Sequence, residues 1–179
     1  AHVIHADGVE VQFIDAPSLF ARERYYGFPD DARRFTAFSM AALTLAQRDG
    51  LHAEVVHAND WPTAMALYAL RTGYAHTPLG RARRVFTIHN LAYQGLFPKS
   101  ELDPLGVPWS AFTPEGVEFY DQLSFMKTGI VCAQQLTTVS PSYAQEIQTP
   151  RFVVGLDGLL KHRAGHLHGD GEYHGVHLT

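Results

Sequence analysis

Three stretches of the chain share one pattern, in which a short apolar run ends in polar residues and a helical segment follows. They are AEVVHANDWPTAMALYALRTG (53–73), VFTIHNLAYQG (85–95) and QLTTVSPSYAQEI (135–147). The apolar runs predict buried strands, and the spacing after the first of them predicts a helix over 63–71. In the third stretch Ser140 is typical of a helix N-cap, with a proline at the first helical position.

Other segments extend this pattern. VEVQFIDAP (9–17) predicts another strand. Apolar residues at intervals of three and four predict a helix over 35–45, which Gly50 would end, and a similar apolar face predicts a helix over 119–133. Strands that alternate with helices are typical of right-handed crossovers and a mostly parallel sheet. We therefore predict an α/β fold, a Rossmann-like open sheet with flanking helices.

Polar residues at the predicted strand ends indicate a ligand site. In open parallel sheets, ligands bind beyond the carboxyl ends of the strands. Residues 57–60, His89 with Asn90, and Ser140 all follow predicted strands. If these strands are neighbours, their ends line one crevice.

The composition is that of one globular domain. The chain has 179 residues, of which 46% are hydrophobic and 18% charged, with a formal net charge of −4. This charge does not fit a nucleic-acid-binding surface, and no apolar stretch is long enough to cross a membrane. The single cysteine, Cys132, excludes an internal disulfide and fits a reducing compartment. With no signal-peptide pattern at the start, we expect a cytoplasmic protein without nucleic-acid or membrane partners.

The stretch HRAGHLHGDGEYHGVHLT (162–179) contains five of the eleven histidines and has no apolar periodicity. A zinc site is one interpretation, because histidine ligates zinc at short spacings. No carboxylate or cysteine frame accompanies these histidines. A solvated tail is therefore the favoured interpretation, and we expect no metal.

Motifs of several common enzyme classes are absent from the sequence. It contains no G-x-G-x-x-G turn, no G-x-x-x-x-G-K-[ST] phosphate loop and no G-x-S-x-G nucleophile elbow. Ser140 lies on a predicted strand-to-helix turn, but Val139 and Pro141 flank it. A hydrolytic serine is therefore disfavoured.

The remaining polar and aromatic residues suit a polyhydroxylated ligand. Asp60 and Asn90 can bind vicinal hydroxyls, and His89 can donate or accept a hydrogen bond near neutral pH. Flat faces for sugar rings are offered by Trp61, Tyr93 and Tyr26.

Each of these assignments has a structural alternative. Asp60 could cap the helix that begins near Trp61. His57 is better explained as a structural histidine than as a ligand, and Trp61 and Tyr93 could equally belong to the core. Composition and spacing alone indicate a ligand-binding α/β domain.

Four colinear motifs resemble one family more specifically. FTIHNLAYQGLFP (86–98) resembles the hallmark of the bacterial glycogen synthase and plant starch synthase family, and VVHANDWPTA (55–64) is similar to its H-x-x-D-W-H-[TA] segment. Residues 119–165 resemble its stretch around TTVSP, and VQFIDAPSLFARERYYG (11–27) resembles its upstream segment. Order and spacing agree from about residue 7 to residue 168.

The resemblance implies a retaining glucosyltransferase of the GT-B type, with two Rossmann-like domains that face a cleft. Such enzymes transfer glucose from ADP-glucose to the non-reducing end of an α-1,4-glucan such as glycogen, without a metal ion or other cofactor. Residues 1–168 would form part of the N-terminal, acceptor-side domain, and 169–179 an irregular tail. The C-terminal GT-B domain would be a missing partner.

The resemblance also implies roles for individual residues. His89 matches the family histidine that lies against the donor glucose, and Asp60 matches an aspartate in the same cleft, so both are expected to be catalytic. Asn90 would orient a sugar hydroxyl, and Tyr26 matches an aromatic residue near the glucose pocket. Gly95 would let the backbone turn closely beneath the sugar. Together with the two aromatic residues named above, these positions form the expected site.

The sequence departs from the family pattern at three positions. Asn59 and Pro62 stand where the family usually has histidine, and Gln134 stands where it usually has aspartate. The family's Lys-x-Gly-Gly-Leu loop and its C-terminal domain, which hold the donor phosphates, have no counterpart in these residues. We therefore expect the chain alone to be inactive. The alternatives are a non-catalytic glucan-binding α/β domain and a stand-alone enzyme that uses Ser140 or the histidine cluster.

Overall fold

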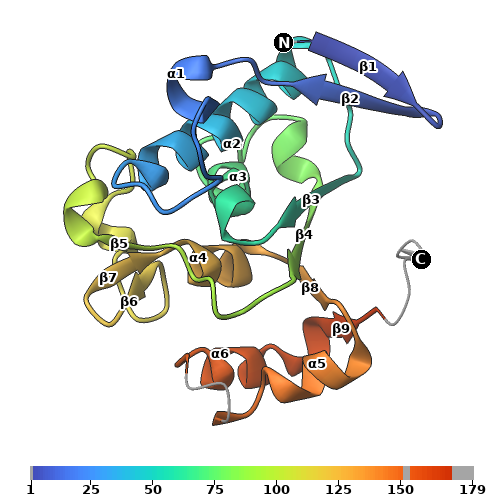
Figure 1. Cartoon of the computed structure of the whole chain (residues 1–179). Coiled ribbons are helices and arrows are strands. Elements are labelled where there is room, and N and C mark those ends of the chain that lie inside the picture. The colour runs from blue at the N-terminus through green and yellow to red at the C-terminus, as the bar shows by residue number, and fades with distance from the viewer. Residues whose placement is uncertain (1, 151–153, 171–179) are drawn as a thin grey trace.

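The computed structural model describes residues 2–150 and 154–170. Its centre is a four-stranded parallel sheet with the strand order β3-β4-β8-β9 (Figure 1). These strands are β3 (Val55–Asn59), β4 (Arg83–Ile88), β8 (Gln135–Thr138) and β9 (Leu167–Gly169). The three predicted strands with polar ends are therefore neighbours, and the predicted parallel α/β sheet is confirmed.

Three helices pack together on the apolar side of this sheet (Figure 1). They are α2 (Asp31–Arg48), α3 (Ala64–Arg71) and α4 (Phe125–Cys132). Successive residues of a strand face opposite sides, so Phe86 and Ile88 of β4 are fully buried beneath the helices. Gly129 of α4 lies directly against the Phe86 ring, where any larger residue would clash. This close contact anchors α4 to the middle of the sheet.

Smaller units surround this core. A hairpin of β1 (His2–Ala6) and β2 (Val9–Phe13) precedes α1 (Pro17–Phe20). A second, antiparallel sheet has the order β5-β7-β6, from β5 (Leu96–Pro98), β7 (Gln122–Ser124) and β6 (Glu118–Phe119). Near the C-terminal end lie α5 (Pro141–Glu146) and α6 (Asp157–His162). Single 3₁₀ turns are η1 (Trp61–Thr63), η2 (Leu79–Arg81), η3 (Lys99–Glu101), η4 (Trp109–Ala111) and η6 (Ala164–His166).

The predicted starts and ends of several helices are confirmed. The helix expected over 63–71 is present as η1 followed by α3, and α2 contains the helix expected over 35–45. Gly50 follows α2 with a φ of +66°. Ser140 caps α5, since its Oγ accepts the backbone N–H of Tyr143 at 3.0 Å.

The predicted helix over 119–133 is wrong in its first part. Tyr120 and Asp121 have φ values of 46° and 62° and form a two-residue hairpin turn between β6 and β7. Helix α4 starts only after Ser124, whose Oγ accepts the N–H of Lys127 at 3.1 Å. Leu123 has the spacing of a helix face, but it lies in strand β7, where its side chain is fully buried.

The predicted strand over 9–17 is shorter than expected and lies elsewhere. It ends at Phe13 and pairs antiparallel with β1, outside the parallel sheet. Proline at position 17 then begins α1, where its missing N–H leaves no bond unmade.

The histidine-rich stretch is partly structured. Within 162–170 the chain completes α6, forms η6 and adds β9 to the edge of the sheet, so a solvated tail is the wrong interpretation for this part. Residues 171–179 lie outside the described residues, and the expected boundary at 168 stays a prediction. Within 2–150 and 154–170, no three His, Cys, Asp or Glu residues are grouped as metal ligands would be. Over the same ranges, no helix combines the length and the apolar character needed to span a membrane.

Candidate functional site

The carboxyl ends of β3 and β4 lie side by side and are joined by hydrogen bonds. The register places Asn59, the last residue of β3, opposite Thr87, and β4 ends one residue later at Ile88. Asp60 and His89 therefore follow the two strands at the same edge of the sheet. The Asp60 N–H donates to the Thr87 carbonyl at 2.9 Å, and the Asp60 Oδ1 accepts the N–H of His89 at 2.8 Å. Two residues that are far apart in the sequence thus form one polar cluster.

Asp60 has an unusual backbone conformation. Its φ of 57° and ψ of 176° lie in a region that is essentially restricted to glycine. Such strain costs on the order of 1–3 kcal/mol and persists only where surrounding contacts fix the residue. The interpretation of Asp60 as a helix cap is wrong, since its side chain makes no cap bond to η1. The carboxylate instead accepts the backbone N–H of His89 and so fixes the backbone directly after β4.

The His89 side chain is exposed, and its orientation is fixed by Asn59. The ring Nε2 lies 3.1 Å from the Asn59 Oδ1. An amide oxygen only accepts hydrogen bonds, so Nε2 is the donor in this pair. The next residue, Asn90, folds back locally, with its Oδ1 accepting the N–H of Ala92 at 3.0 Å. Apart from its departure from the family pattern, no feature of the sequence indicated a role for Asn59.

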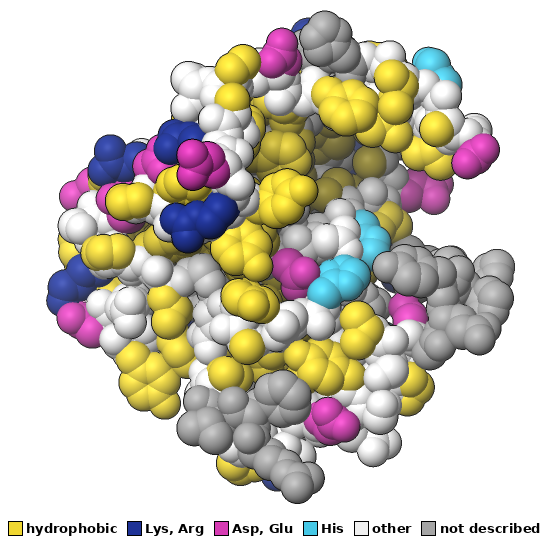
Figure 2. Space-filling model, viewed as in Figure 1, with side chains coloured by type: hydrophobic (Ala, Val, Ile, Leu, Met, Phe, Trp, Pro, Cys, Tyr) yellow, Lys and Arg dark blue, Asp and Glu magenta, His cyan; other side chains and the backbone are white. Residues whose placement is uncertain are grey.

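A cavity of about 620 Å³ includes Trp61, the residue after Asp60, in its lining, but Asp60, His89 and Asn90 do not line it. The exposed rings of Tyr26 and Tyr93 and the buried indole of Trp61 line it together with Gln94. The centroid of the Tyr26 ring is 5.9 Å from that of Trp61 and 5.7 Å from that of Tyr93. Histidine and acidic side chains gather beside a hydrophobic surface near the middle of this face (Figure 2). The structure therefore brings the predicted aromatic residues together.

Trp61 has both of its expected roles. It belongs to the core, with 5% of its surface exposed and its ring 4.9 Å from that of Phe35, and it also forms the base of the cavity. Gly95 approaches it closely. With a φ of +59°, Gly95 could not carry a Cβ without placing it 2.5 Å from the Trp61 Cε3. The tight turn expected at Gly95 is thus packed against the indole.

Gln94 was missed by sequence reasoning. Its Nε2 donates to the Val154 carbonyl at 2.7 Å. Its Oε1 is buried and has no hydrogen-bond partner among the described residues. The residue lines the cavity, but this oxygen is itself buried and would have to become exposed before it could accept a hydrogen bond from a ligand. No periodicity or motif distinguishes such a glutamine in the sequence.

A chain of hydroxyls connects His57 to the centre of the sheet. The His57 Nε2 lies 2.5 Å from the Thr87 Oγ1, which lies 2.5 Å from the Thr137 Oγ1. Partial burial lowers the pKa of His57, and the nearby His89 lowers it further, while Asp170 opposes both. These contacts support the interpretation of His57 as a structural histidine.

Ser140 is occupied by its role at the start of α5. Its Oγ contacts the N–H of Tyr143 and, at 3.0 Å, the Ser142 hydroxyl. No histidine among the described residues hydrogen-bonds to it. The arrangement of a nucleophile with an adjacent base, which a hydrolytic serine needs, is not present in the described residues.

A family model for the starch synthase catalytic domain matches residues 1–162. The chain belongs to this family. A glycogen synthase from Myxococcus xanthus is 49% identical over 171 residues, which cover 92% of this chain and 36% of that relative. Another glycogen synthase, from Thermus thermophilus, is 49% identical over 152 residues, which cover 84% of this chain and 31% of that relative.

The same likeness is found among solved structures. The catalytic domain of starch synthase IV from Arabidopsis thaliana, bound to ADP and acarbose, superimposes with a TM-score of 0.85 and 35% sequence identity. The match covers 93% of this chain and 35% of that one. The resemblance read from the four motifs is therefore confirmed, as is the GT-B class of the fold. The chain spans about a third of the length of the relatives it matches.

Proposed function

We propose that this chain is the acceptor-side, N-terminal part of a glycogen synthase that transfers glucose from ADP-glucose to α-1,4-glucan with retention of configuration. The observation that carries the proposal is the Asp60–His89 bond of 2.8 Å at the adjoining ends of β3 and β4. It fixes the backbone of His89 to Asp60, directly before Trp61, which lines the aromatic cavity, although neither Asp60 nor His89 is itself among the lining residues. Relatives at 49% identity that are named glycogen synthase support the same reaction.

Each polar residue has a defined part in this proposal. Glucosyl transfer develops positive charge on the sugar ring, and a fixed carboxylate such as Asp60 stabilises it without reorganising. His89, whose ring is held by Asn59 at 3.1 Å, fixes the donor glucose through the ring edge that faces away from Asn59. The side chain of Asn90 orients a sugar hydroxyl. These groups act by position and charge, and the proposal involves no metal ion or other cofactor.

The aromatic cavity suits a sugar ring. Its volume of about 620 Å³ lies within the usual range for small-molecule sites of roughly 300–1,000 Å³. Tyr26, Tyr93 and Trp61 present apolar ring surface, while Gln94 and Asp31 are polar residues of the lining. This combination of flat apolar faces with few polar groups fits a glucosyl unit of the acceptor or the donor.

The proposed enzyme requires more than this chain. No lysine or arginine is among the residues that line the described cavity, so a nucleotide diphosphate finds no cationic clamp there. The starch synthase IV structure with ADP is about three times as long as the part matched here. We propose that the rest of a full-length synthase supplies the diphosphate site, that the isolated chain is inactive, and that the enzyme is cytoplasmic.

A chimera tests this proposal. This chain replaces the corresponding 36% of the Myxococcus xanthus glycogen synthase, and glucose transfer from ADP-glucose to maltoheptaose is measured. His89→Ala should lower turnover on the order of a hundredfold, and Asp60→Asn should have a comparable effect. His76→Ala, at an exposed histidine after α3, serves as the matched control.

Two results would count against the proposal. If His89→Ala and His76→Ala chimeras extend maltoheptaose equally fast, His89 has no catalytic part. If the chain alone extends maltoheptaose from ADP-glucose, the requirement for the second domain is wrong.

A second candidate function is glucan binding without catalysis, favoured by the aromatic rings of Tyr26, Tyr93 and Trp61 in the lining of the cavity. A Trp109→Phe variant leaves Trp61 as the single tryptophan. Titration with maltoheptaose should then give a saturable change in Trp61 fluorescence. A linear or absent response would argue against a glucan site within this chain.

A further inference from the structure

An ion pair is buried at the start of α2, next to the cavity. The Arg34 Nη1 lies 3.1 Å from the Asp31 Oδ1, one turn apart on the helix, and each residue exposes 3% of its surface. Burial of two charges carries a large desolvation cost, so such a pair is weak evidence of a stabilising role by itself. Its other contacts indicate what it does.

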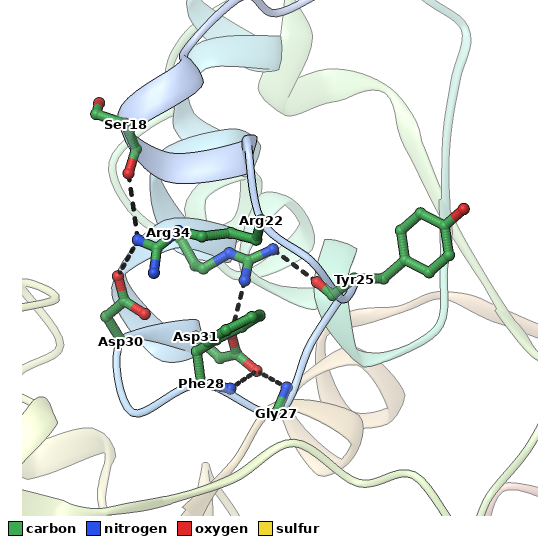
Figure 3. Close-up of polar contacts among 8 residues, drawn as sticks. All are labelled: Ser18, Arg22, Tyr25, Gly27, Phe28, Asp30, Asp31 and Arg34. Carbon is green, nitrogen blue, oxygen red and sulfur yellow. Dashed lines mark hydrogen bonds and ion pairs between the residues drawn. The ribbon is translucent and has the colours of Figure 1, made fainter.

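Both members of the pair bind the backbone of the segment 25–28 (Figure 3). The Asp31 Oδ2 accepts the N–H of Gly27 at 2.6 Å and that of Phe28 at 3.1 Å. The Arg34 Nη2 donates to the Tyr25 carbonyl at 2.6 Å. These bonds hold the backbone on both sides of residue 26 and leave its side chain free to face the cavity.

Aromatic rings enclose the guanidinium. The Arg34 Cζ lies 4.7 Å from the centroid of Phe35, 5.3 Å from that of Phe28 and 5.7 Å from that of Phe20. Cation–π contacts in a desolvated site are stronger than those at the surface. The guanidinium is therefore confined by rings around it while it holds the Tyr25 carbonyl.

This anchoring distinguishes two adjacent tyrosines. Tyr25 exposes 89% of its surface, and its ring points away from the network (Figure 3). Tyr26 exposes 42% and contacts Trp61 and Tyr93 across the cavity. Gly27, with a φ of +96°, supplies the bend directly after Tyr26. A shift of the backbone by one residue in this segment would place Tyr25 at the cavity in the position of Tyr26.

We propose that Asp31 and Arg34 are positioning residues, which hold Tyr26 over Trp61 and so keep one wall of the cavity in its binding position. Residues 21–30 contain no helix or strand that could hold Tyr26 by itself. A wall that is already ordered does not have to be ordered when the ligand binds, and the affinity is higher for this reason. That the ligand is a glucan rests on the proposed function, whereas the positioning of Tyr26 does not.

Two variants and a control test the proposal in the whole chain, on the Trp109→Phe background. Asp31→Asn keeps the shape of the side chain and weakens the contacts to Gly27 and Phe28. If Asp31→Asn does not fold, because it leaves the Arg34 charge buried without a partner, the double variant Asp31→Asn with Arg34→Met replaces it and removes both charges. Asp30→Asn is the matched control, since it removes the neighbouring carboxylate, whose 2.8 Å ion pair with Arg22 is more exposed.

The first measurement needs no ligand. Nuclear Overhauser contacts between the Tyr26 and Trp61 rings should be present in the wild type and in Asp30→Asn and lost in the Asp31 variants. The second measurement is the affinity for maltoheptaose, followed by Trp61 fluorescence. We expect the Asp31 variants to bind about tenfold more weakly, close to the loss caused by Tyr26→Ala.

A double-mutant cycle separates positioning from general stability. On a Tyr26→Ala background, Asp31→Asn should weaken binding no further, because the residue it positions is already gone. Additive losses, or ring contacts that persist in the Asp31 variants, would overturn the proposal. If the ring contacts respond as expected but the wild-type chain does not bind maltoheptaose, the positioning role stands and the proposed glucan site fails.

Discussion

Replacement of Gly95 by alanine tests the packing of the site most directly. Gly95 has a φ of +59°, and an added Cβ would lie 2.5 Å from the Cε3 and 2.7 Å from the Cδ2 of Trp61. Trp61 packs against Phe35, Phe97 and Phe125, so its ring can move away from an added Cβ only by changing these contacts. Both the backbone conformation and the contact with the indole oppose a side chain at this position.

The loss of stability has two parts that can be separated. A left-handed backbone conformation costs a non-glycine residue about 1–2 kcal/mol. Overpacking of a filled core costs about 1–3 kcal/mol more, so the expected total for Gly95→Ala is about 2–5 kcal/mol. Gly106 has a φ of +69° with nothing within 4 Å of an added Cβ. Gly106→Ala should therefore lose only the first part, about 1–2 kcal/mol.

Urea unfolding followed by far-ultraviolet circular dichroism measures the free energy of unfolding of both variants. For a chain of this size, each kcal/mol corresponds to roughly 2–4 °C in Tm, so thermal unfolding gives an independent value. The reasoning is refuted if Gly95→Ala is no less stable than Gly106→Ala. It is also refuted if the near-ultraviolet circular dichroism signal of Trp61 is unchanged in Gly95→Ala, because the added Cβ would then not have displaced the indole ring.

Three further predictions concern residues around the sheet. Thr87→Val should lower the free energy of unfolding by about 1–3 kcal/mol in urea, because the buried Thr137 hydroxyl loses its partner; a change below about 0.5 kcal/mol would contradict this. Burial, and then the nearby His89, lower the pKa of His57 in the folded state, so the unfolded state binds the proton more readily. Stability should therefore fall as the pH drops through about 6.5, and urea midpoints of His57→Gln should change less over this range. Burial raises the pKa of the Cys132 thiol, so its reaction with Ellman's reagent should be on the order of tenfold or more slower in the folded chain than in urea.

The strand ends were predictable because local pattern and general topology agree there. The run 85–88, which is rich in β-branched and aromatic residues, favours a buried strand, and a parallel sheet carries its polar continuation to the ligand-binding edge. His89 and Asp60 could thus be predicted to lie at one edge before any contact between them was known. The bond between the Asp60 carboxylate and the His89 N–H could not, because it depends on the register of two strands separated by a whole helix.

The position of Leu123 and the choice between Tyr25 and Tyr26 could not be predicted from sequence patterns. Leu123 has the spacing of a helix face, but the positive φ values at Tyr120 and Asp121 place it in a hairpin. The choice between Tyr25 and Tyr26 is made by a buried pair on the next helix. The local sequence pattern allows helix or strand at Leu123 and either tyrosine at the cavity. A turn decides the first and a tertiary contact the second.

The departure of Asn59 from the family pattern is accommodated by the geometry of the site. The Asn59 Oδ1 accepts a hydrogen bond from the His89 Nε2 at 3.1 Å, and the histidine that the resemblance led us to expect at this position could also accept one. Pro62 is equally well placed, since it stands in the first turn of η1, where its missing N–H leaves no helical bond unmade. Both substitutions therefore keep the orientation of His89 and the path of the chain into Trp61.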